Sequence, residues 1–107
     1  MQHSNLAAGK WQNLSLYEQM GNIGSEVDRV IRSKEKDQIA FENAITRALE
    51  LIDLTISAHS KEKGLIEIVR VRELFCAAFL GSDQYKTSLE DLNKYFMQFA
   101  LAARLNK

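Results

Sequence analysis

Apolar residues recur every three or four positions through most of this 107-residue chain. That spacing places them on one side of an α-helix, because a helix completes a turn every 3.6 residues. The first series is Leu16, Met20, Ile23, Val27, Val30 and Ile31. Ser15 and Glu18 stand at its start with the spacing of a capping box, so we expect a helix to begin there.

Two glycines, Gly21 and Gly24, lie inside this first predicted helix. A glycine in a helix interior lowers stability by up to about 1 kcal/mol. Gly24 shares the apolar side of the helix. Either a second helix approaches closely at Gly24 and compensates for this loss, or the helix kinks there; the sequence leaves both alternatives open.

The next series is apolar around more than half of the helix circumference: Phe41, Ala44, Ile45, Ala48, Leu49, Leu51, Ile52, Leu54 and Ile56. We therefore expect this helix to be the most buried. Residues 33–38 are expected to separate it from the first helix, with Asp37 as its N-cap. Because this stretch lacks glycine and proline, one long bent helix is the alternative.

Residues 65–81 form a mostly apolar run that has to be assigned to a strand or a helix. As a strand it would carry apolar and charged residues on both faces, and it would exceed the usual strand length of about 5–6 residues. As a helix it gives one apolar stripe: Leu65, Ile68, Val69, Phe75, Cys76 and Phe79. We predict a helix, with Ser60 capping its start and Gly81 ending it.

The last segment opens with two overlapping capping-box patterns, Thr87 with Glu90 and Ser88 with Asp91. A narrow apolar stripe follows: Leu89, Leu92, Phe96, Phe99, Ala100 and Ala103. Three apolar residues lie outside it: Tyr95, Met97 and Leu101. We expect them to form an exposed apolar fringe that could meet another subunit.

These segments together predict an all-α protein, an antiparallel helical bundle of about four helices. Residues 1–14 are expected to form an irregular arm and residues 15–107 a single helical-bundle domain. The wide apolar arcs of the second and third helices exceed what one small bundle needs to hide. We therefore expect a homodimer. A different protein could also bind the same exposed apolar surface.

Charge and composition argue against several classes of function. Fourteen basic and fourteen acidic residues cancel, which argues against a nucleic-acid-binding surface. No run approaches the roughly 20 apolar residues of a membrane span, and the first residues do not resemble a signal peptide. Cys76 is the single cysteine, so no disulfide forms within the chain, and a cytoplasmic location is expected.

The arginines inside the apolar segments are the candidate binding groups. On the helical wheel Arg72 lies near the centre of the apolar arc, Arg70 lies nearer the back, and Arg47 lies at the edge of the second helix's arc. One interpretation is a buried or interface ion pair, for which Glu26 and Glu73 are the candidate partners. The other is a site where convergent arginines hold phosphate or carboxylate.

The chain carries no recognisable pattern for metal or nucleophilic catalysis. His3 and His59 stand far apart, and Ile56 occupies the position where a Glu-x-x-His pair would need its glutamate. No zinc-ligand spacing of cysteine and histidine occurs. Asp53 falls on the solvent side of its helix, and His59 falls at the helix end. We predict no catalytic residue, no metal and no cofactor.

Three stretches, NLSLYEQMGNIGSEVDRVI, RALELIDLTI and YFMQFALAAR, resemble in order a family of short uncharacterised prokaryotic all-helical proteins. The resemblance spans roughly residues 11–104 and implies the fold but no activity. The chain also resembles, more weakly, the HEPN-type helical partners of minimal nucleotidyltransferases, some of which are ribonucleases. Their active proteins place an arginine shortly ahead of a histidine, but the corresponding positions before His59 hold Ile52, Asp53 and Leu54. A partner role is what this second resemblance implies.

The sequence thus predicts a non-enzymatic helical interaction module that self-associates. The alternative is a protein or enzyme that binds a small anion or nucleotide through the arginines.

Overall fold

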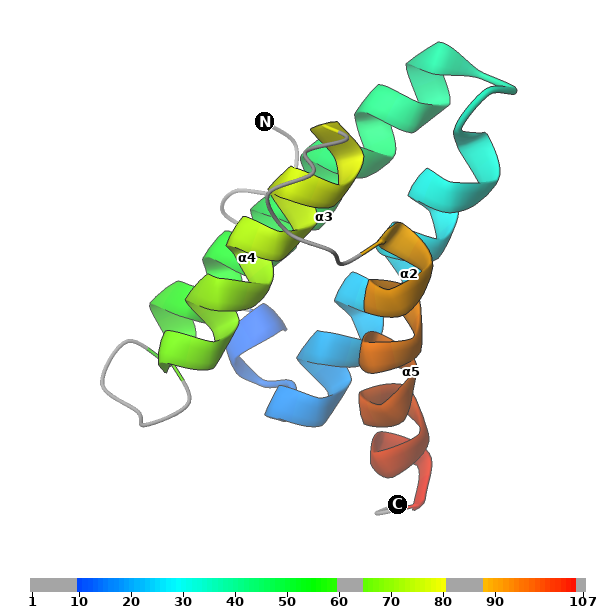
Figure 1. Ribbon diagram of the computed structural model, residues 1–107. Helices are drawn as coiled ribbons and strands as arrows, with labels where there is room; N and C mark the ends of the chain where they lie inside the picture. The colour runs from blue at the N-terminus through cyan, green and yellow to red at the C-terminus, as the bar shows by residue number, and fades with distance from the viewer. Residues whose placement is uncertain (1–9, 60–64, 81–87, 106–107) are drawn as a thin grey trace.

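The capping and spacing patterns of the sequence are matched by four long helices in a computed structural model of the chain, which describes residues 10–59, 65–80 and 88–105. They are α2 (Leu16–Ser33), α3 (Gln38–Ala58), α4 (Leu65–Leu80) and α5 (Leu89–Leu105) (Figure 1). Residues 10–12 are also helical, and the described ranges contain no strand. The prediction of an all-α protein is confirmed, and so is the assignment of residues 65–80 to a helix.

The helix starts follow the predicted caps. The Ser15 side chain accepts a hydrogen bond from the backbone N–H of Glu18 (3.1 Å), and the Glu18 carboxylate accepts one from the N–H of Ser15 (3.0 Å). Ser88 and Asp91 exchange the same pair of hydrogen bonds at the start of α5. The other predicted caps, at Ser60, Gly81 and Thr87, lie outside the described residues.

α2 and α3 are two helices joined by a turn, so the alternative of one bent helix is wrong. Asp37 caps α3 as predicted, because its carboxylate accepts a hydrogen bond from the N–H of Ala40 at 3.1 Å. Glu35 has a φ of 73°, a left-handed conformation that L-residues rarely adopt. This conformation reverses the chain direction without a glycine.

α2 buries more residues than α3, so the prediction that α3 is the most buried helix is wrong. α5 packs on one side of α2 and α3 on the other, while α4 lies beside α3 (Figure 1). The buried apolar residues of α2 are Met20, Ile23, Val27 and Val30, and they meet Phe96 from α5 and Ile52 from α3 in one core. The wide apolar arc of α3 is only partly covered, because α3 lies toward the outside.

Gly24 brings α2 and α5 into close contact, so the close-approach alternative is correct. A Cβ atom placed on Gly24 would lie 2.6 Å from Phe96 Cβ, and one on Gly21 would lie 3.3 Å from Ala100 Cβ. Because position 21 faces position 100 and position 24 faces position 96, the two helices run in opposite directions.

The segment before α2 is part of the core rather than an irregular arm. Trp11 is buried, and its indole Nε1–H donates a hydrogen bond to Thr55 Oγ1 on α3 at 2.9 Å. The side-chain amide of Gln19 donates to the backbone oxygen of Trp11 at 2.8 Å. The prediction of an irregular arm is therefore wrong for residues 10–12, and residues 1–9 lie outside the described ranges.

The buried side of α4 differs from the predicted stripe. Ile68, Val71 and Phe75 are buried, whereas Val69 is 38% exposed and Cys76 is half-buried. The side chain of Leu65 lies outside what the structure describes. Because α4 is apolar nearly all round, the sequence could not set its rotation. Within the described residues, no helix combines the length and hydropathy that a membrane span requires.

Candidate functional site

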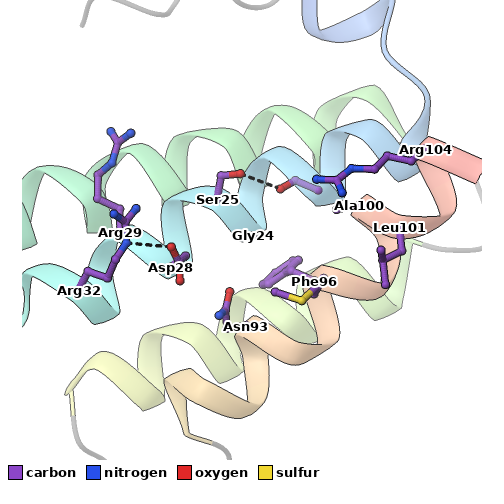
Figure 2. A pocket seen from close by; sticks show the side chains of 12 residues that line it. Gly24, Ser25, Asp28, Arg29, Arg32, Asn93, Phe96, Ala100, Leu101 and Arg104 are labelled. Carbon is purple, nitrogen blue, oxygen red and sulfur yellow. Dashed lines mark hydrogen bonds and ion pairs between the residues drawn. The ribbon is translucent and has the colours of Figure 1, made fainter.

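A groove of about 480 Å³ lies between α2 and α5 (Figure 2). Gly21 and Gly24 line it from α2, and Phe96 and Ala100 line it from α5. The groove opens beside the close helix contact that these glycines permit, since Gly24 lies against Phe96 and Gly21 lies against Ala100.

One wall of the groove is apolar and exposed. Met97 and Leu101 line it and are 55% and 52% exposed, and Leu105, one turn further along α5, is also exposed. Two of the three residues of the predicted apolar fringe are thus on the surface. The third, Tyr95, is half-buried and packs its ring against Phe99, with centroids 5.2 Å apart.

The two ends of the groove are cationic. Arg29 and Arg32 lie at one end and Arg104 at the other (Figure 2). Arg32 pairs with Asp28 at 2.9 Å, and Arg29 lies 3.5 Å from Glu26. Among the described residues, no carboxylate lies within ion-pair distance of Arg104. No sequence pattern links these three arginines, because only the antiparallel contact of α2 and α5 places them along the same groove.

The arginine predicted to be central, Arg72, forms an ion pair at the edge of α4. Its Nε donates to Asp53 Oδ1 at 2.8 Å, and the two side chains are 39% and 55% exposed. This hydrogen bond raises the pKa of the Arg72 guanidinium above its ordinary value. The partner is Asp53 of α3, and neither of the two candidate glutamates, Glu26 and Glu73, takes that place.

The other predicted site residues are dispersed. Arg70 lines a smaller pocket of about 240 Å³ between α4 and α5, while Arg72 reaches toward α3. Arg47 is exposed on α3 and Glu73 is exposed on α4. Glu26 remains on α2 beside Arg29, with its Oε2 buried and without a hydrogen-bond partner among the described residues. The structure therefore does not bring the three predicted arginines to one point.

The pocket beside Arg70 contains one unusual titratable group. The Tyr95 hydroxyl donates a hydrogen bond to Glu67 Oε1 at 2.6 Å and links α5 to α4. Burial raises the pKa of Tyr95 above its ordinary value, and the hydrogen bond to Glu67 adds to that shift. A neutral tyrosine held in this hydrogen bond links two helices and does not act as a general base near neutral pH.

A chain of polar side chains joins the N-terminal segment, α2 and the end of α3. His59 is the C-cap of α3, at the helix end where the sequence placed it, and its Nε2 lies 2.8 Å from Gln19 Oε1. Because the Gln19 amide nitrogen donates to the Trp11 carbonyl, the Gln19 oxygen is left to accept from the imidazole. This arrangement satisfies buried polar groups, which assigns it a structural role.

Within residues 10–59, 65–80 and 88–105, no three His, Cys, Asp or Glu side chains are placed to hold a metal ion. Comparison of the chain with models of protein families, with curated proteins and with solved structures finds no match. The groove between α2 and α5 therefore has to be interpreted from its own geometry and chemistry.

Proposed function

We propose that the chain is a non-enzymatic helical interaction module, an antiparallel bundle of about four helices that self-associates as a homodimer. The observation that supports this most strongly is the pair Met97 and Leu101, each more than half exposed beside a groove floored by glycine and alanine. Apolar side chains gathered at a hollow mark interaction sites more often than scattered ones do.

The groove suits a protein surface better than a small ligand. Its volume falls within the roughly 300–1,000 Å³ of ligand pockets, but such pockets orient their ligand with convergent polar groups. Here the arginines do not converge, since two lie at one end and one at the other, and both polar and apolar side chains line the stretch between them (Figure 2). Methionine is a side chain that adapts to the shape of a protein partner.

The alternative, binding of a small anion or nucleotide by Arg47, Arg70 and Arg72, has weaker support. Arg72 already pairs with Asp53, and Arg70 lines a pocket on another side of α4. If this alternative were correct, inorganic phosphate would raise the melting temperature of the wild-type chain, and the rise would be lost in Arg70→Gln.

Sedimentation velocity from about 1 μM to about 1 mM tests self-association across the range of weak homodimers. We expect the mass to move from the 12.2 kDa of one chain toward twice that value. The double variant Met97→Lys/Leu101→Lys should weaken association about tenfold or more, because it places charge on the apolar wall. The matched control is Ile66→Lys/Leu80→Lys, which adds the same charge at two exposed apolar positions of α4.

A strict monomer across the whole range would overturn the proposal. So would association that the α4 control weakens as much as the α5 variant, because the α5 wall would then have no special role.

A further inference from the structure

Three exposed residues of α5, Glu90, Met97 and Arg104, are spaced seven positions apart. Seven residues are two helical turns less about 20°, so the three side chains share one side of the helix. The glutamate and the arginine each lie about 10 Å from Met97 along the helix axis, in opposite directions. The exposed side of α5 therefore carries an acid, an apolar centre and a base at equal intervals.

Glu90, Met97 and Arg104 form what we call the α5 seam. Neither of its two charges is neutralised by a partner within the described part of the chain. Glu90 and Arg104 have no ion pair or side-chain hydrogen bond with another described residue. Elsewhere on the surface, Asp28 with Arg32 and Asp53 with Arg72 form close pairs. Two charges of opposite sign that have no partner among the described residues, equidistant from an exposed methionine, form a self-complementary pattern.

We infer that two copies of the chain pair through α5 in antiparallel orientation, with Met97 on the twofold axis and Glu90 of each copy opposite Arg104 of the other. This inference rests on the proposed self-association and specifies its surface. In a twofold interface the same patch serves both partners, so each contact occurs twice. The equal seven-residue intervals bring both ion pairs into register at once.

The opposite orientation is disfavoured by the same charges. A parallel pair of α5 helices would place Glu90 against its own copy and Arg104 against its own copy, which sets like charges opposite each other. Electrostatics at an interface acts chiefly on specificity, so the charges select the antiparallel arrangement while the apolar centre provides most of the affinity.

The groove accommodates the apolar centre of this pairing. With Met97 on the axis, Leu101 of one copy lies opposite Asn93 of the other, and both positions line the groove. The methionine and leucine of the second copy pack against the exposed wall formed by Met97 and Leu101 of the first. Lys94 lies at the edge of the seam, about 60° around the helix from Met97, where its charge stays in solvent.

Charge reversal tests whether Glu90 of one copy lies opposite Arg104 of the other. Glu90→Arg alone should weaken association about tenfold, because it sets arginine against Arg104 twice, and Arg104→Glu alone should do the same. The double variant Glu90→Arg/Arg104→Glu should restore association to within about threefold of wild type. Sedimentation velocity gives the association constants, and circular dichroism checks helix content.

Matched controls carry the same reversals on α3, where Glu42→Arg and Arg47→Glu change exposed residues without touching the seam. Should a reversed variant fail to fold, the neutral variants Glu90→Gln and Arg104→Gln replace it and should each weaken association about threefold.

If wild type associates but the single reversals weaken association no more than the α3 controls do, the antiparallel pairing is overturned. The proposed self-association would then still stand. Failure of the double variant to recover would overturn it as well. A monomeric wild-type chain would instead overturn the proposed function itself, so the two failures are distinguishable.

Discussion

Gly24 and Phe96 lie closer together than any residue with a Cβ at position 24 would permit, since that Cβ would stand 2.6 Å from Phe96 Cβ. This contact fixes the rotation of α5 against α2. With Phe96 turned into the core, Met97 lies about 100° further around the helix and faces outward. The close packing of the core and the exposed wall of the groove therefore have the same origin.

Replacing Gly24 with alanine should lower the free energy of unfolding by about 1–3 kcal/mol, because the new methyl group overlaps the fixed Cβ of Phe96. Gly21→Ala is the comparison, since its nearest contact, 3.2 Å to Ala100 Cα, needs a far smaller shift. Its overlap is offset by the higher helix propensity of alanine, about 1 kcal/mol. Urea denaturation measures the free energy of unfolding of both variants. Equal stability of the two variants would contradict the close approach at Gly24.

Replacing Thr55 with valine should lower the free energy of unfolding by about 1–3 kcal/mol, because the buried indole N–H of Trp11 loses its acceptor. Thr46→Val is the control, since Thr46 lies on the same helix and its hydroxyl bonds only to the Glu42 carbonyl in solvent. Trp11 is the only tryptophan, so its fluorescence follows unfolding directly. If the two valine variants were equally stable, Trp11 would not be anchored as described.

Replacing Arg72 with methionine should change the free energy of unfolding by less than about 1 kcal/mol, because the pair with Asp53 is half-exposed and screened by solvent. A fully buried pair would instead lose about 3–5 kcal/mol when one partner is removed. Urea denaturation of Arg72→Met beside Asp53→Asn at low ionic strength measures the difference, because urea does not screen the charges. A loss in the larger range would contradict a solvent-screened pair and would favour the buried or interface ion pair that the sequence offered as one of two interpretations.

The stability of the wild-type chain should fall more steeply in alkali than that of Tyr95→Phe. The pKa of Tyr95 is raised in the folded state, so its neutral form contributes stability fully at pH values below the ordinary tyrosine pKa of 10.0. This contribution is lost as the pH rises beyond that value. Thermal melts from pH 8 upward compare the two chains, with Tyr17→Phe as the control for an exposed tyrosine. Parallel curves for wild type and Tyr95→Phe would contradict the shift.

The sequence predicted the helix ends well because the caps are local. Ser15, Asp37 and Ser88 bond within three residues of their own positions, so their partners can be read from spacing alone. The apolar side of α2 was predicted for a similar reason, since its polar and apolar residues separate cleanly around the helix.

The errors concern positions that depend on how helices cross. Arg72 and Asp53 are both edge residues, and they meet only because α4 lies beside α3. Trp11 belongs to no periodic series, so nothing local shows that Thr55, far along the chain, accepts its hydrogen bond. The groove likewise needs the antiparallel contact of α2 and α5, although the seven-residue spacing of Glu90, Met97 and Arg104 was present in the sequence.

Disulfide formation at position 97 is a direct test of whether two copies pair through α5 with Met97 on the twofold axis. A residue on a twofold axis faces its own copy, so Met97→Cys in a Cys76→Ser background should form a covalent dimer rapidly under mild oxidation. The control, Ile66→Cys in the same background, presents a thiol at a more exposed position of α4. If α5 pairs in this way, cross-linking is fast at position 97 and slow, limited by random collisions, at position 66. Equal rates at the two positions would contradict it.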